Sequence, residues 1–469
     1  MDTTPSKGNK FKLPEDVHFL NRISYGPTPE TVALVANMGW DAVLENQLHP
    51  ESIDTSVIDN ALILEQPVLA FSPKDIAESN DPEIVSKAVS GFVGASLIRQ
   101  LYSPAQLYER MVEFWSDHFN MNILDGRVYV FKASDDKEAI RPNALGKFRD
   151  LLHANARSPA MLLYLDNYSN TKFGPNENYA RELLELHTLG VDGGYTEADV
   201  VAVARAFTGW TIDEETLEFT FRPGLHDSGK KRVLGQKIKT VQNGGIGDGE
   251  QVLDLLAIHP STAHFISTKL ARRFVSDNPP EALVADMAEV FLETDGDIKA
   301  LLHTLFHSDE FWASTELKMK RPVDLMTSVY RRLGLTQDDN TSNYLRYKLD
   351  QMGQIPFLWE TPDGYPDTAE YWTNTAALVN RWNVAKDAAY FLPRGRYLEM
   401  LDGANTVNGI IQAMSIALID RKLKKNELRK IRKNIYPSKL PNKPIKGNLI
   451  PSARTVAIAL LSSRYFQMR

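Results

Sequence analysis

The stretch NENYARELLELHTLGVDGGYTEADVVAVARAFTGW (residues 176–210) has the pattern of two helices joined by a glycine-rich turn. In each half, apolar residues recur three and four positions apart, which is the spacing of one face of an α-helix. Gly190 ends the first helix, because glycine adopts the left-handed conformation there without steric cost. Thr196 and Asp199 form a capping box that starts the second helix. We therefore expect a helical hairpin within a mainly α fold.

The first of these helices, residues 177–188, carries a histidine in its apolar stripe. At about 100° per residue, His187 lies on the apolar half of the helix, whereas Arg181 and Glu182 lie on the polar half. Glu182 is near the edge of that half, and Arg181 can pair with an acidic residue four positions away. A buried histidine is more often a packed core residue than a ligand, so His187 alone favours a structural interpretation.

A second histidine has the same setting. The segment SPAQLYERMVEFWSDHFN is predicted to start a helix at Ser103. His118 lies in its apolar stripe, and acidic residues, among them Glu113 and Asp117, lie on the opposite side. If the two helices pack together, His118 and His187, with a carboxylate or a third histidine, would make a site for one divalent metal ion.

The third candidate ligand is His226, in the segment FTFRPGLHDSGKKRVLG. Alternating apolar residues at 217–221 predict a strand, and the proline and glycines that follow predict a loop that carries His226 and Asp227. Loops on a rigid scaffold often carry binding residues. A polar turn in which Asp227 caps its own backbone is an equally good interpretation.

The segment GQIPFLWETPDGYP, residues 353–366, predicts a stiff aromatic loop. Phe357, Trp359 and Tyr365 are candidates to line a pocket for a sugar or a peptide, because aromatic rings give contact area with little loss of entropy. The alternative is an ordered segment whose aromatic side chains plug gaps between helices. The sequence does not separate these two interpretations.

In these segments the chain resembles a bacterial family known as domain of unknown function 1800. The matching segments are 176–210, YSPAQLYERMVEFWSDHF, ALGKFRDLLHANARSPAMLLYLDN, HDSGKK, LLAIHPSTAHFISTKLARRFV and GQIPFLWETPDGYP. They span about residues 17–383, and the family motifs include the positions of His118, Glu182, His187 and His226. The resemblance implies no activity, because the family is named for the lack of one. Its genes often lie beside those of exported, sulfatase-like proteins, which implies a companion of that kind as a partner.

Composition excludes several classes of protein. The chain has 469 residues, 43% of them hydrophobic, and a net charge of −7, which argues against a nucleic-acid-binding protein. It contains no cysteine, so thiolate catalysis, disulfides and zinc–thiolate sites are excluded. Nucleotide-binding glycine motifs are missing too. The basic run 421–433 can meet an acidic surface, but such a run is more often a solvated helix face.

The sequence contains no stretch long and apolar enough to span a membrane, and its N-terminus lacks the apolar part of a signal peptide. As written, the chain is therefore expected to be cytoplasmic. A periplasmic location requires that a leader was removed or that a partner assists export.

Three parts are expected along the chain. Residues 1–16 form a flexible N-terminus, and 17–383 form the helical family domain, with a small β-hairpin-like insertion near 213–246. Residues 384–469 form a C-terminal helical extension that contains the basic run 421–433.

Two functional hypotheses follow. In the first, a pocket between helices holds a metal or a small ligand for hydrolytic or redox chemistry. It would be lined by the histidines, with three polar residues as catalytic or binding support. The residues in question are His118, His187 and His226, supported by Arg181, Glu182 and Asp227. In the second, the protein is a non-catalytic helical scaffold that binds the exported companion, and the histidines are core residues.

Overall fold

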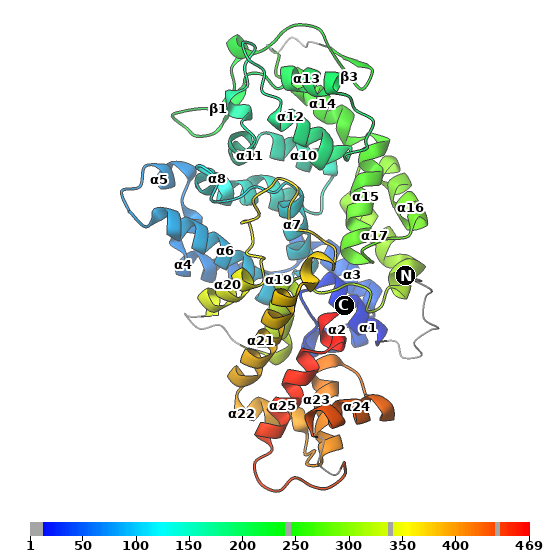
Figure 1. The fold of residues 1–469 in the computed structure, drawn as a ribbon. Coiled ribbons are helices and arrows are strands. Elements are labelled where there is room, and N and C mark those ends of the chain that lie inside the picture. Colours follow the sequence, from blue (N-terminus) through cyan, green and yellow to red (C-terminus); the bar gives the residue numbers. More distant parts are fainter. Residues whose placement is uncertain (1–12, 240–244, 336–340, 437–440) are drawn as a thin grey trace.

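The computed structural model describes residues 13–239, 245–335, 341–436 and 441–469, and it is mainly helical, as the sequence predicts (Figure 1). Most of the predicted N-terminal segment 1–16 lies outside these residues. Within the described ranges, no helix has the length and apolar character needed to cross a bilayer.

The first third of the chain is a series of helices. They are α1 (Glu15–Ile23), α2 (Pro29–Met38), α3 (Trp40–Leu48), α4 (Ser56–Glu65), α5 (Pro73–Ala77), α6 (Ile84–Tyr102), α7 (Gln106–His118), α8 (Val128–Asp135), α9 (Arg141–Asn143), α10 (Phe148–Ala156) and α11 (Pro159–Tyr164). The predicted N-cap of α7, Ser103, lies two residues too early, because the helix is capped at Ala105. The Ser103 hydroxyl accepts a hydrogen bond from the backbone N–H of Ala105 and forms a turn before the helix begins at Gln106.

The predicted helical hairpin is present. It consists of α12 (Asn178–Glu182), the π-helix η5 (Leu183–Thr188) and α13 (Glu197–Ala206). The Thr196–Asp199 capping box is confirmed, and Gly190 has a φ of 85°. The expected α-helix over 177–188 becomes a π-helix after Glu182, because the Leu189 N–H bonds the carbonyl five residues back. Single π-helical turns often occur at functional sites.

Two small hairpins follow this segment. Strand β1 (Trp210–Ile212) pairs with β2 (Phe219–Phe221), and β3 (Lys231–Val233) pairs with β4 (Gln236–Ile238), both antiparallel. The predicted β-like insertion near 213–246 is therefore confirmed, although its first strand begins earlier, at Trp210. Residues 240–244 lie outside the described part of the chain.

The remaining chain is helical. It contains α14 (Gly247–Ala257), α15 (Pro260–Phe274), α16 (Glu281–Glu293), α17 (Ile298–His307), α18 (Asp309–Ala313), α19 (Pro322–Leu333), α20 (Thr341–Gln351), α21 (Thr375–Phe391), α22 (Arg394–Leu401), α23 (Val407–Ile419), α24 (Lys425–Ile435), α25 (Ile450–Leu461) and α26 (Arg464–Gln467). Most of the basic run lies on α24, where Lys425, Arg429, Lys430 and Lys433 are exposed, as expected of a solvated helix face.

In the described part of the chain, the helices enclose two large apolar cores and two small apolar clusters. The first joins α1–α3, α7, α8 and α10–α18, and the second joins α6 with α19–α25. The second core includes side chains on both sides of residue 383, among them Phe92, Val323 and Val456. The helices of the predicted C-terminal extension thus share a core with α6 and α19. The division at 383 itself stays a prediction.

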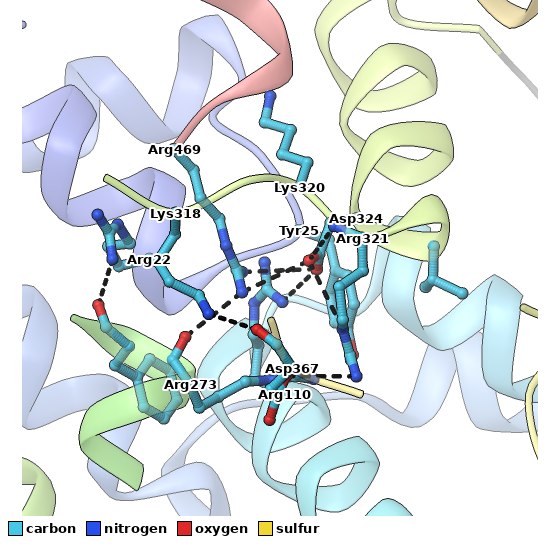
Figure 2. Close-up of polar contacts among 12 residues, drawn as sticks. Arg22, Tyr25, Arg110, Arg273, Lys318, Lys320, Arg321, Asp324, Asp367 and Arg469 are labelled. Carbon is cyan, nitrogen blue, oxygen red and sulfur yellow. Dashed lines mark hydrogen bonds and ion pairs between the residues drawn. The ribbon is translucent and has the colours of Figure 1, made fainter. Parts of the chain in front are cut away.

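A layer of buried charges connects the two cores. Asp324, on α19, is ion-paired with Arg110 of α7 at 2.5 Å and with Arg469 at 3.4 Å, and the Arg321 guanidinium lies 4.0 Å away. Figure 2 shows Arg110 and Arg469 directed at Asp324 from separate segments, whereas the side chain of Arg321 extends past Asp324 toward Asp367. Burial raises the pKa of Asp324, but the surrounding guanidinium groups outweigh it and hold the pKa well below its usual value. The carboxylate is therefore ionised at neutral pH.

We predict that Asp324→Ala destabilises the protein strongly. Removing one partner of a buried ion pair leaves uncompensated charge, which costs about 3–5 kcal/mol. The change is measured as the free energy of unfolding in guanidinium chloride. Glu399→Ala, which removes an exposed pair with Arg396, is the control and is expected to cost about 0.5 kcal/mol or less. Equal effects of the two substitutions would contradict the prediction.

Candidate functional site

Two of the three predicted histidines meet in the first core. The ring centroids of His118, at the end of α7, and His187, in the π-helix, are 6.1 Å apart. His118 Nε2 lies 3.0 Å from the His187 carbonyl oxygen and must donate a proton to it, because a carbonyl only accepts. This contact fixes the tautomer of a neutral His118, whose Nδ1 is then an acceptor.

The acceptor nitrogen of His118 is used by a lysine. Lys269 Nζ, from α15, lies 2.9 Å from His118 Nδ1. Burial lowers the pKa of Lys269 to about 8, although Asp367 and Asp117 act in the opposite direction. Burial and the nearby Lys269 ammonium also lower the pKa of His118 well below its usual value. A neutral imidazole therefore faces a weakened ammonium group.

His187 is fully buried, and neither of its ring nitrogens has a hydrogen-bond partner within the described residues. Its ring packs against Phe119 at 5.0 Å between centroids. Burial, with a contribution from Lys269, lowers the pKa of His187 to about 3, so the ring is neutral at physiological pH. The prediction that His187 faces the apolar side of its helix is confirmed.

The predicted aromatic loop lies over the end of α7. The Asn120 side-chain amide donates to the carbonyls of Trp359 and Thr361 at 3.1 and 2.7 Å. Gly364 has a φ of 76° and passes so close to α7 that a Cβ atom there would overlap the Asp117 carbonyl oxygen. The loop is therefore seated on the helix by backbone contact, which only glycine permits at this point.

The loop borders a cavity of about 440 Å³. Trp359, Tyr365 and Tyr371 contribute aromatic rings to it, with Trp359 5.0 Å from Tyr365 and 5.7 Å from Tyr371 between centroids. The other lining residues are Asp350, Gly353, Ile355, Leu358, Glu360 and Thr361. Phe357 is not part of this wall. It packs against Phe92 at 4.5 Å in the second core, as the plug interpretation describes.

The polar side of α7 is buried beside this loop. Glu113 pairs with Arg273 at 2.6 Å and with Arg321, and Asp117 pairs with Arg321 at 2.9 Å. Asp367, at the end of the loop, pairs with Arg273 at 2.7 Å. Burial raises the pKa of Asp117 to about 6, with Arg321 opposing the shift and Glu113 adding to it. The face of α7 opposite His118 is thus largely covered as well, with the Glu113 and Asp117 side chains 11% and 22% exposed.

His226 belongs to a separate cluster. Its Nδ1 lies 2.8 Å from the Thr208 carbonyl oxygen, and its Nε2 lies 3.3 Å from Asp248, which also binds Lys231 at 2.8 Å. No contact in the described residues joins His226 to His118 or His187. The neighbouring Asp227 is ion-paired with Arg205 at 2.7 Å, and hydrogen bonding from Arg205 lowers its pKa to about 2.

Arg181 and Glu182 occupy different surroundings. Arg181 forms two hydrogen bonds of 2.8 Å to the exposed Glu197 and a longer one to Glu177, on the protein surface. Glu182 is half-buried, and burial, followed by the charge of Glu185, raises its pKa. The charge of Asp363, in the aromatic loop, adds to the rise in the pKa of Glu182.

The three histidines do not fit a metal site in this arrangement. Both nitrogens of His118 are engaged, one by a carbonyl and one by the Lys269 ammonium, and His226 lies in another cluster. Within the described ranges, no three histidine, aspartate or glutamate side chains form a group that could hold a metal ion. The metal-binding role stays a sequence-based prediction.

Sequence reasoning missed Lys269 and the burial of Asp117. Lys269 borders the apolar stripe of α15, but a lysine at such an edge usually extends its ammonium to solvent, so the pattern gives no signal. Asp117 was assigned to the polar side of its helix, where exposure is the ordinary outcome.

Fold and site together define a mainly helical protein with a partly buried histidine–lysine contact and a cavity bordered by an aromatic loop. A family model described as protein of unknown function (DUF1800) matches residues 18–468, so the chain belongs to this family. The match extends past residue 383 and includes the C-terminal helices. No curated protein and no solved structure matches the chain.

The lowered pKa of His187 predicts a pH dependence of stability. The unfolded chain binds a proton near pH 6.5 and the folded chain only near 3, so stability is complete above pH 6.5 and is lost as the pH falls. Between pH 7 and 5, protonation of His187 in the unfolded chain should lower the free energy of unfolding by about 2 kcal/mol. His187→Gln should flatten that part of the unfolding profile, whereas His303→Gln, at an exposed histidine, should not. Parallel profiles for the wild type and His187→Gln would disprove the assignment.

The seating of the loop is tested with two glycines in that loop. Gly353 and Gly364 have φ values of 77° and 76°, but a Cβ at Gly353 meets nothing within 4 Å. Gly353→Ala should therefore lower the free energy of unfolding only by the backbone strain, about 1 kcal/mol. Gly364→Ala adds the clash with α7 and should cost at least about 2 kcal/mol more. Thermal unfolding measures both, and equal losses would show that the loop is not seated as described.

Proposed function

We propose that this protein binds a small polyhydroxylated ligand, of the carbohydrate class, in the cavity bordered by the loop 353–367. The observation that carries the proposal is the composition of the cavity wall, where the rings of Trp359, Tyr365 and Tyr371 lie together with the carboxylates of Asp350 and Glu360. Its volume of about 440 Å³ is in the range of small-molecule sites, roughly 300–1,000 Å³.

The chemistry of the wall supports a sugar. Aromatic rings offer flat apolar area to the C–H face of a pyranose, and carboxylate oxygens accept hydrogen bonds from its hydroxyl groups. A nucleotide or another anionic ligand fits less well, because the charged groups in the wall, Asp350 and Glu360, are both acidic.

The aromatic rings are held before any ligand arrives. Trp359 Nε1 donates to Asp363 at 2.9 Å, and Thr361 donates to the same carboxylate at 2.5 Å. The Tyr365 hydroxyl donates to the Ile355 carbonyl at 2.6 Å. Rings fixed in this way lose little entropy on binding, which supports a binding role for the loop.

The family's gene neighbourhood remains the support for an exported, sulfatase-like companion. A sugar-binding role is compatible with such a partner, because both proteins would then meet the same class of molecule. Partnership stays a prediction, as does the compartment.

The proposal predicts saturable binding of a saccharide. Thermal shift with neutral, amino and acidic mono- and disaccharides should identify a stabilising sugar, and calorimetry should then give its affinity. Trp359→Ala should weaken that affinity at least tenfold, equivalent to about 1.4 kcal/mol. Phe173→Ala removes an aromatic ring that is 81% exposed and outside the cavity, and it should leave the affinity unchanged.

Two outcomes would overturn the proposal. One is a folded wild-type protein that no saccharide of the panel stabilises. The other is a sugar whose affinity is the same in Trp359→Ala and in the wild type, because that sugar would bind elsewhere.

A further inference from the structure

We propose that Lys269 is a nucleophilic amine that condenses with a small uncharged aldehyde or ketone to form an imine. The inference is independent of the sugar cavity, because it depends on the contacts of Lys269 with His118. It assigns this position on α15 a covalent role that the sequence analysis did not include.

The first support is the kind of partner that Lys269 has. In the described part of the chain, three of the four buried lysines are paired with carboxylates: Lys132 with Asp135 at 2.7 Å, Lys231 with Asp248 at 2.8 Å and Lys318 with Asp277 at 2.5 Å. The fourth, Lys320, lies over the Phe466 ring at 3.9 Å and, unlike Lys269, is buried. Within the described residues, no carboxylate lies within 4.0 Å of Lys269 Nζ, and its hydrogen-bond partner is the imidazole of His118. An imidazole stabilises an ammonium ion less than a carboxylate does, so this contact holds the proton of Lys269 less firmly than an ion pair would.

The second support is the fixed orientation of His118. Its Nε2–H donates to the His187 carbonyl, so Nδ1 keeps its lone pair toward Lys269. A neutral lysine amine has two N–H groups and one lone pair. When one N–H donates to His118 Nδ1, the lone pair is directed away from the imidazole and is available for attack.

The third support is access. Lys269 is only partly buried, and its Nζ lies 5.5 Å from the ring centroid of Phe265, which gives the ammonium an apolar neighbour on one side. The lowered pKa of Lys269, described above, agrees with this environment. Lys269 thus keeps part of its surface exposed, which reaction with a small carbonyl compound requires.

The surrounding charges select the carbonyl compound. Asp117, Asp363 and Asp367 all act on Lys269, and Arg272 opposes them. Asp117 and Asp367 are themselves ion-paired with Arg321 and Arg273, so neither of these guanidinium groups is free to hold an anionic ligand there, and an uncharged aldehyde such as glycolaldehyde needs no cation. The proposed ligand class is therefore a small neutral aldehyde or ketone.

The reaction balances without an oxidant or a reductant. The amine lone pair forms a C–N bond with the carbonyl carbon, and the carbonyl oxygen takes up a proton. The resulting carbinolamine loses water: its C–O bond breaks with a second proton transferred to oxygen, and nitrogen releases its protons as the C=N bond forms. Asp117, with its pKa raised to about 6, is a nearby proton donor and acceptor.

The test uses the full chain and glycolaldehyde at limiting concentration with cyanoborohydride, followed by peptide mapping. Reduction traps each imine as a stable amine. Lys269 should be modified at least tenfold faster than Lys318, which is the matched control because burial also lowers its pKa to about 8 but Asp277 pairs with it.

Two variants test whether the rapid labelling depends on Lys269 and on its contact with His118. Lys269→Arg should remove the rapid label while the other sites stay unchanged. In His118→Phe, residue 118 cannot accept a hydrogen bond from the Lys269 amine, and labelling of Lys269 should be several-fold slower. A native circular dichroism spectrum shows that the variant is folded. Labelling of Lys269 at or below the rate of Lys318 in the wild type overturns the proposal, whatever the variants do.

Discussion

The carboxylate of Asp324, buried among Arg110, Arg321 and Arg469, is the constraint on which the arrangement of helices depends. A buried charge is tolerated only when it is paired and hydrogen-bonded, so the helices that supply the partners have little freedom to move apart. Arg110 belongs to α7 in the first core, and Asp324 belongs to α19 in the second. One ion-paired cluster therefore fixes how the two apolar cores meet.

The same constraint positions the candidate site. Helix α7 is covered on both sides, with His118 buried in the apolar core and with Glu113 and Asp117 partly buried among arginines. Asp367 extends that cluster into the end of the aromatic loop through Arg273. The loop is thus tied to the same charges that join the cores. Its path over the end of α7 follows from that attachment and from the close approach of Gly364.

Much of the local structure could be predicted from short-range chemistry. The Thr196–Asp199 box, the left-handed Gly190 and the inward-facing His187 each follow from a few neighbouring residues and the period of a helix. The π-helix could not be predicted in this way, because an i to i+5 hydrogen bond and an i to i+4 bond suit nearly the same residue pattern. The site was predicted only in part: His118 and His187 meet, but His226 lies in another cluster.

By itself, the sequence determined the helical class, the small β insertion, the capped hairpin and the two histidines that face inward, because these depend on periodicity and on capping over a few residues. Tertiary structure alone decided that Glu113 and Asp117 are buried, that Lys269 contacts His118, and that Trp359 borders a cavity while Phe357 fills a gap in the core. The reason is physical. A polar side chain is exposed or buried according to the partners that distant segments bring to it, and those partners leave no mark on its own neighbourhood in the chain.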